Sequence, residues 1–327
     1  MVLLIGNRAL SSPVFLAPLA GITDLPFRNL VSSFGAGLVV SEMVASQEMV
    51  QAKPDSTTQA RVRAELGGGN TAVQIAGRDA YWMAECARMV ADNGAQLIDI
   101  NMGCPAKKVT NGYSGSALMK DLDHALTLIE AVVNAVDVPV TLKTRLGWDD
   151  DLLNAPELAL RAEQVGVQMI TIHGRTRCQF YKGHADWAAI AKVKAAVTVP
   201  VIANGDIVDT ATARRALELS GCDGVMVGRG AQGRPWALAQ ISADILGVAP
   251  PCVPRGDNLI GLISNHYEDI LMFYGPKLGN RVARKHLGWY MDDLPVPTDL
   301  RRQIMTQTDP EKVQQLLHQL PTEKAAA

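Results

Sequence analysis

Residues 94–101 read Gly-Ala-Gln-Leu-Ile-Asp-Ile-Asn, and two later stretches align with them without a gap. These are Gly166-Val-Gln-Met-Ile-Thr-Ile-His173 and Gly221-Cys-Asp-Gly-Val-Met-Val-Gly228. Each begins with a glycine that ends a helix and runs into a short apolar segment typical of a buried strand. Residues 135–143 and 196–204 align in the same way. The recurring unit predicts a closed parallel sheet rather than a solenoid, whose repeat period would be shorter.

Helical and strand patterns alternate along the first two thirds of the chain. Eight strands are expected at residues 14–17, 38–40, 71–75, 97–100, 138–143, 169–173, 199–204 and 224–228. Helices are expected between them at 24–34, 79–93, 122–133, 155–165, 187–196 and 210–219. This alternation predicts an α/β protein built on a (β/α)8 TIM barrel, a fold of about 250 residues.

The pattern changes after a proline-rich segment at residues 250–254. Helical patterns follow without intervening strands, at 257–274, 279–292, 298–305 and 310–320. We place a domain boundary here, with a catalytic barrel in residues 1–250 and a small helical bundle in residues 251–327. The tail at 322–327 is expected to fray.

Composition describes an ordinary globular protein of 327 residues with 48% hydrophobic residues and a net charge of −2. Because the charge is nearly balanced, binding to nucleic acid would need a local basic face. No apolar run approaches the roughly 20 residues that span a bilayer, so we expect a cytoplasmic protein, a monomer, without a membrane partner. The five cysteines have no Cys-x-x-Cys spacing, which argues against a disulfide framework and against a metal site.

Polar residues gather where the expected strands end. The aligned repeats put Asn101, His173 and Gly228 at one equivalent position, and Lys143 and Asn204 at another. The carboxyl ends of barrel strands meet at one rim, which is where this fold places its chemistry. A buried lysine is costly without a partner, so Lys143 calls for an anionic ligand or for an ion pair with Glu42 or Asp99.

Two glycine turns follow the seventh and eighth strands. They are Asn204-Gly205-Asp206 and Gly228-Arg229-Gly230. Such turns can present backbone N–H groups to a phosphate, and TIM barrels commonly bind phosphate after these two strands. A glycine also suits any tight turn, so the placement carries more weight than the residues.

Cys104 lies just past a strand end, in Asn101-Met-Gly-Cys-Pro105. A free cysteine is most often a small buried hydrophobic residue. At this rim a thiol can also act as a nucleophile or as a proton donor. The position makes Cys104 the candidate catalytic residue.

These motifs together resemble those of the flavin-dependent tRNA-dihydrouridine synthases, and most closely the bacterial B-type branch. The matching segments are Asn101-Met-Gly-Cys-Pro-Ala-Lys-Lys-Val109, Ala17-Pro-Leu-Ala-Gly-Ile-Thr-Asp24, His173-Gly-Arg-Thr176 and Asn204-Gly-Asp206. The resemblance covers nearly the whole chain, and the Asn-x-Gly-Cys-Pro motif is highly specific. It implies an FMN cofactor held by Pro18, Leu19, Ala20, Gln74, Lys143, His173, Asn204, Gly205, Asp206, Gly228 and Arg229.

The resemblance also implies a reaction. FMN reduced by NADPH or NADH would give a hydride to C6 of a uracil, and Cys104 would give a proton to C5. Asn101 is expected to hold the edge of a uracil flipped out of its stack. Arg281, Arg284 and Lys285, at helical spacing with His286 and Tyr290 nearby, are expected to form a basic face that binds the tRNA.

Two other functions remain open on the sequence. The same flavin barrel could reduce a free pyrimidine, although a small substrate does not require the helical C-terminal part. A non-catalytic RNA-binding or regulatory protein on a barrel is the other, although it would not need an intact Cys104 and a full set of cofactor residues.

Overall fold

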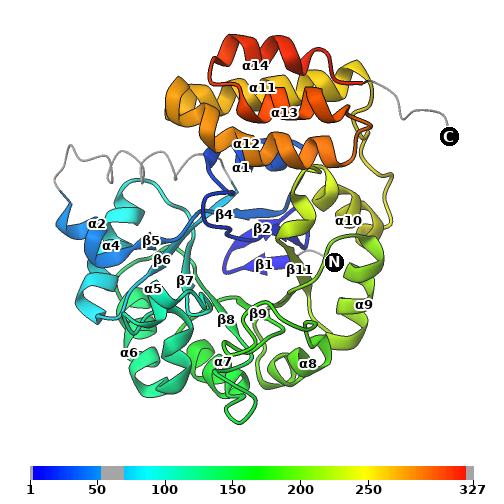
Figure 1. Ribbon diagram of the computed structural model, residues 1–327. Coiled ribbons are helices and arrows are strands. Elements are labelled where there is room, and N and C mark those ends of the chain that lie inside the picture. The colour runs from blue at the N-terminus through cyan, green and yellow to red at the C-terminus, as the bar shows by residue number, and fades with distance from the viewer. Residues whose placement is uncertain (1–2, 53–69, 322–327) are drawn as a thin grey trace.

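The computed structural model describes residues 3–52 and 70–321. Figure 1 shows a closed barrel of eight parallel strands surrounded by helices. The strands, in order around the barrel, are β3 (Val14–Leu16), β4 (Leu38–Val40), β6 (Thr71–Ala76), β7 (Ile98–Asn101), β8 (Val140–Arg145), β9 (Ile170–His173), β10 (Val201–Asn204) and β11 (Gly224–Val227). β11 pairs with β3 and closes the sheet, which confirms the predicted (β/α)8 barrel.

Helices cover the outside of the barrel. They are α1 (Leu25–Ser33), α4 (Ala80–Asp92), α6 (Leu122–Val133), α7 (Ala155–Gln164), α8 (Trp187–Ala196), α9 (Thr210–Ser220) and α10 (Ala237–Leu246), of which only α10 was not predicted. An aspartate side chain caps the first turn of α1, α4, α6, α8 and α9. Its carboxylate accepts a backbone N–H that has no partner within the helix, so the helices begin at defined positions after the strands.

Short elements occupy the loops at the carboxyl-terminal rim. They are β5 (Val44–Ala45), α2 (Ser46–Gln51), α5 (Lys107–Thr110) and the 3₁₀ turns η1 (Gly115–Lys120) and η2 (Arg229–Ala231). α5 and η1 lie in the loop that carries Cys104. Local structure therefore holds the part of the loop that follows the thiol.

An N-terminal hairpin, which the sequence did not reveal, closes the opposite end of the barrel. It consists of β1 (Leu3–Ile5) and β2 (Arg8–Leu10), paired antiparallel. Leu3, Ile5 and Leu10 pack with side chains of the barrel interior. Three-residue strands carry too little periodicity to be recognised. Apolar side chains therefore fill the amino-terminal end of the barrel, and the barrel opens at its carboxyl-terminal rim.

Residues beyond the barrel form a bundle with its own hydrophobic core. Its helices are α11 (Asp257–Tyr274), α12 (Pro276–Asp292), α13 (Thr298–Thr306) and α14 (Pro310–Leu317). Figure 1 shows the bundle on one side of the barrel, where α11 packs on α1. The predicted fraying at 322–327 falls outside the described residues. Within the described ranges, no helix has the length and apolar character needed to cross a membrane.

Candidate active site

A chain of buried hydrogen bonds links three neighbouring strands at the rim. Gln74 on β6 donates to Asp99 Oδ2 over 2.7 Å, and Thr141 on β8 donates to Asp99 Oδ1 over 2.6 Å. Asn101 Nδ2 donates to Gln74 Oε1 over 2.7 Å. Burial raises the pKa of Asp99, while the two donated hydrogen bonds act in the opposite sense. Each of these side chains orients the next, so the network has a single arrangement.

Asn101 also holds the loop that carries Cys104. Its Oδ1 accepts the backbone N–H of Gly103 at 3.1 Å and that of Cys104 at 3.0 Å. On the far side of the loop, the Ser116 hydroxyl donates to the Cys104 carbonyl over 2.9 Å. The thiol is half-buried. The predicted position of Asn101 at the strand end is correct, and its amide is largely engaged within the protein.

Arg145 is a site residue that the sequence analysis missed. β8 was expected to end at Lys143 but continues to Arg145, which is 1% exposed. Arg145 Nε donates to the Gly103 carbonyl over 2.7 Å, and Nη1 donates to the carbonyls of Thr176 and Phe180 over 3.1 and 3.0 Å. It thereby ties the Cys104 loop to the loop after β9. The two-residue spacing from Lys143 was the available signal, because alternate strand residues share a face.

Lys143 points into the barrel mouth without a carboxylate partner. Its ammonium donates to Asn204 Oδ1 over 3.1 Å, and Asn204 Nδ2 donates to the Met226 carbonyl over 2.8 Å. Burial lowers the pKa of Lys143 to about 8, with the charge of Arg145 adding to the effect and that of Asp99 opposing it. The alternative of an ion pair with Glu42 or Asp99 is wrong, since Lys143 forms no ion pair among the described residues. An anionic ligand remains the expected partner.

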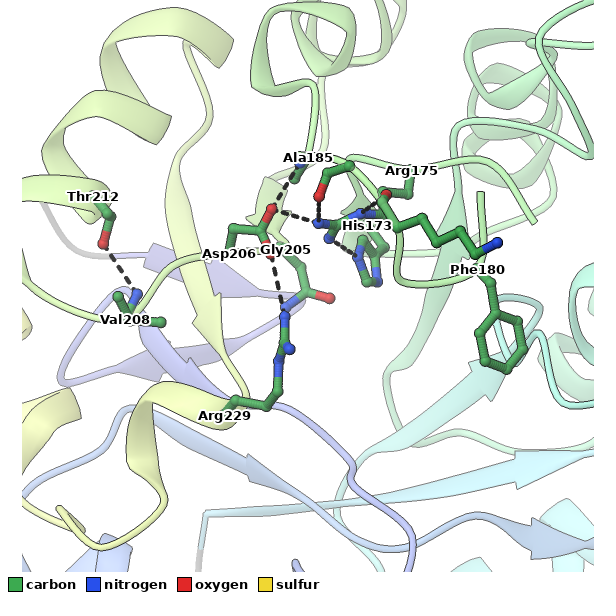
Figure 2. Close-up of polar contacts among 12 residues, drawn as sticks. His173, Arg175, Phe180, Ala185, Gly205, Asp206, Val208, Thr212 and Arg229 are labelled. Atoms are coloured by element: carbon green, nitrogen blue, oxygen red, sulfur yellow. Dashed lines mark hydrogen bonds and ion pairs between the residues drawn. The ribbon is translucent and has the colours of Figure 1, made fainter. Parts of the chain in front are cut away.

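Figure 2 shows a second cluster at the ends of β9 and β10. The Asp206 carboxylate pairs with Arg175 at 2.6 Å and with Arg229 at 3.3 Å. Arg175 Nη1 lies 3.3 Å from His173 Nε2, which accepts from it. Burial, together with the charges of Lys143 and the arginines around it, holds the pKa of His173 well below its usual value. His173 is therefore neutral at pH 7, and several positive charges face one region of the mouth.

Gly205 is required for this cluster to form. Its φ is +109°, and a Cβ at this position would lie 2.9 Å from the His173 ring and 2.8 Å from Ala185. Asp206 follows with a φ of +54°. The turn aims the Asp206 carboxylate at two arginines. Asp206 therefore orients Arg175 and Arg229. It would act on a bound anion through these arginines and not by direct contact.

The remaining predicted cofactor residues lie at the same rim. Pro18, Leu19 and Ala20 follow β3, where the Leu19 N–H donates to the Thr23 hydroxyl over 2.9 Å. Gly228 follows the adjacent β11, and a Cβ there would lie 3.6 Å from Leu19. Gly228 is therefore not required by steric crowding in the way that Gly205 is.

The predicted basic face on α12 is only partly formed. Lys285 reaches the barrel mouth, where its ammonium would lie 3.3 Å from a Cβ at Gly21. Arg281 is exposed, whereas Arg284 turns toward the bundle and lies 3.4 Å from the Gln307 carbonyl. The expected aromatic neighbours, His286 and Tyr290, are 1% and 3% exposed and cannot stack on RNA. The expectation of an aromatic basic face is wrong because His286 packs on Phe27 of α1 and Tyr290 belongs to the core of the bundle.

Comparison with known proteins gives a consistent family assignment. The family model described as Dihydrouridine synthase (Dus) matches residues 15–326. A probable tRNA-dihydrouridine synthase of Rhodobacter capsulatus is 61% identical over 328 residues, which is 100% of each chain. The tRNA-dihydrouridine synthase B of Xanthomonas campestris is 47% identical over 313 residues, with 94% of this chain and 92% of the relative covered.

Solved structures show a similar fold at low sequence identity. Morphinone reductase is 14% identical with a TM-score of 0.55, over 79% of this chain and 93% of that one. A 2-naphthoyl-CoA reductase is 13% identical with a TM-score of 0.58, over 76% of this chain and 52% of that one. At these identities the likeness establishes the barrel fold alone.

Proposed function

Because this chain belongs to the dihydrouridine synthase family and is therefore an oxidoreductase, we propose that it reduces the C5–C6 double bond of uridines in tRNA. The observation that carries the proposal is the position of Cys104. Asn101 and Arg145 hold its loop at the barrel mouth, next to Lys143 and the arginine cluster. A proton donor and an anion-binding rim therefore share one opening.

We propose FMN as the cofactor in this opening, and the residues present fit it. Arg229 is exposed and offers positive charge to a phosphate, Arg175 adds buried charge beside it, and the close turn at Gly205 brings the two together through Asp206. Lys143 supplies a hydrogen-bond donor for a polar ring edge, and the buried Gln74 contributes to the site by holding Asn101 in place. Asp206 keeps both arginines in place, and Pro18, Leu19, Ala20, Asn204 and Gly228 complete the surface of the site. When bound and reduced by NADPH or NADH, the flavin supplies the hydride for C6 of the uracil.

Cys104 delivers the proton to C5 of the uracil in this proposal. Thiols stay largely protonated at neutral pH, so a thiol can act as a general acid without an activating base. Asn101 positions the thiol through the backbone of the loop, and its remaining amide N–H is available to a uracil carbonyl. The uridine has to leave its stack to reach this point.

The rest of the tRNA is held outside the barrel mouth. We propose that the helical part, residues 251–327, provides this contact, with Lys285 at the edge of the mouth and Arg281 farther along α12. Arg284 supports α12 from within the bundle. The protein would act as a monomer in the cytoplasm, where its tRNA substrate is found.

Dihydrouridine mapping at nucleotide resolution tests the function. In tRNA from cells that lack this protein, we expect dihydrouridine to disappear from defined positions and to return with the wild-type gene. Purified protein should be yellow and show a flavin absorbance band. An unchanged map would overturn the proposal, and activity on free uracil but not on tRNA would favour a pyrimidine reductase.

A further inference from the structure

A cavity of about 430 Å³ lies beside the Cys104 loop, outside the polar network of the barrel mouth. The start of α2, the turn between β6 and α4, and the loop after β7 form its walls. This volume is within the range of about 300–1,000 Å³ that is common for small-ligand sites. None of the roles proposed above uses the cavity.

Two unpaired cations border the cavity. Arg78 and Lys108 are both exposed, and neither forms an ion pair with the described residues. Arg78 donates only a long hydrogen bond of 3.4 Å, to the Gly112 carbonyl. Of the two lining carboxylates, Asp79 is used as the N-cap of α4, and Glu48 lies on the exposed edge. The cavity therefore offers positive charge that is not neutralised by contact.

Trp82 forms an aromatic wall of the cavity, and Ser46 forms part of its floor. Ser46 is 1% exposed, and its hydroxyl has no hydrogen-bond partner among the described residues. An aromatic wall, unpaired cations and polar groups are what a stacked nucleotide requires.

We propose that the cavity binds one nucleotide of the tRNA, next to the uridine that is reduced. The base lies against Trp82, and its phosphate interacts with Arg78 and Lys108. The exposed Glu48 can accept a hydrogen bond from the edge of the base. This inference rests on the proposed function, because it takes tRNA to be the molecule that covers this rim.

Occupation of the cavity would act on the proton donor through the loop. Val109, Gly112 and Ser114 line the cavity and belong to the segment between Cys104 and Ser116. Gly115 has a φ of +60°, and a Cβ there would lie 2.8 Å from the Cys104 carbonyl. A nucleotide in the cavity therefore contacts the same packed unit that positions the thiol.

Steady-state and binding measurements on the full-length flavin-loaded protein test this inference. The variants are Trp82→Ala and the double variant Arg78→Gln/Lys108→Gln. Lys107→Gln is the matched control, because Lys107 is an exposed neighbour that does not line the cavity. Substrates are unmodified tRNA transcripts, and the rate of flavin reduction by NADPH is measured separately.

Trp82→Ala should weaken tRNA binding about 5- to 150-fold, as expected for loss of one stacked base. The double variant should weaken binding and lower the salt dependence of affinity by about one to two counterions. Flavin reduction by NADPH should not change in either variant. The double variant keeps the inference testable if Trp82→Ala fails to fold.

Unchanged tRNA affinity in the double variant would overturn the inference. Slower reduction by NADPH would also overturn it, because the cavity would then serve the dinucleotide. Failure of the wild-type protein to form dihydrouridine would instead overturn the proposed function. These results are distinguishable, since tRNA affinity is measured independently of turnover.

Discussion

Two clusters of buried polar side chains in this molecule differ in how many of their polar atoms are hydrogen-bonded. At the barrel mouth, Gln74, Asp99 and Asn101 satisfy one another through hydrogen bonds of 2.7 Å. Between barrel and bundle, His266 has one bond, to the Tyr290 hydroxyl at 3.0 Å, and His286 has none among the described residues. We call the second cluster, His266, His286, Tyr290 and Phe27, the histidine seam.

The side chains at the mouth are oriented by hydrogen bonds, whereas those at the seam are held by packing. Hydrogen bonds at the mouth fix the direction of each side chain, which a reacting group needs. In the histidine seam, Phe27 of α1 lies 5.8 and 5.1 Å from the two imidazole rings, centroid to centroid. Burial lowers the pKa of His266 to about 3, so the rings are neutral and pack as aromatic bodies. Loss of the reacting thiol at the mouth should alter chemistry, and loss of packed volume at the seam should alter stability.

The largest expected effect is on chemistry at the mouth. Cys104→Ala should lower turnover on tRNA by about 10²- to 10⁴-fold, the usual contribution of a general acid. Flavin reduction by NADPH and the free energy of unfolding should stay near wild type. Stopped-flow kinetics measures flavin reduction by NADPH, and a turnover assay measures the reaction on tRNA. Cys252→Ala, at an exposed cysteine, is the control. Full activity of Cys104→Ala would show that the thiol at the mouth is not the proton donor.

Next in size is the loss of packing at the histidine seam. Phe27 is fully buried, and Phe27→Ala should lower the free energy of unfolding by about 3–5 kcal/mol. Urea denaturation measures it. Tyr81→Ala, at a side chain 62% exposed, should stay within about 0.5 kcal/mol of wild type. Equal losses in the two variants would show that the seam is not a packed interface.

An effect of comparable size is expected from acid. The folded-state pKa values of His266 and His286 lie below that of an unfolded histidine, so the unfolded chain takes up protons first. Stability is complete above pH 6.5 and falls below it by about 1.4 kcal/mol per pH unit for each histidine. Asp24 and Asp269, whose pKa values are raised, act in the opposite sense at lower pH. Denaturation between pH 7 and pH 5 tests this, and a flat profile would contradict it.

The smallest effect is expected when a seam histidine becomes apolar. Because neither nitrogen of His286 has a described partner, His286→Phe should leave stability at pH 7 within about 1 kcal/mol of wild type. It should also lower by one the number of protons that the chain takes up when it unfolds in acid. Asn101→Leu at the mouth is the matched contrast, since it leaves Gly103, Cys104 and Gln74 without their partner and should cost about 1–3 kcal/mol. Similar results for both would erase the distinction between the clusters.

The barrel could be predicted because its signal is local and repeated. Each buried strand is an apolar run between a helix-ending glycine and a polar strand end, so the eight strands and the rim position of Asn101, Lys143 and His173 follow from spacing. Exceptions occur where the local signal is weak or misleading. β8 runs to Arg145 although a basic residue argues against a buried strand, and the hairpin of β1 and β2 is too short to show a pattern.

What the sequence determined by itself is the barrel, its rim and the residues that gather there, because parallel strands bring their ends together whatever surrounds them. Only the tertiary structure decided how those residues are used. The Asp206 carboxylate pairs with arginines from two other loops, and Arg145 reaches a carbonyl 42 residues away in the chain. The face of α12 that carries His286 and Tyr290 is buried because α1 and α11 lie against it. A helix pattern shows which residues share a face, but the partner that covers the face comes from a distant part of the chain.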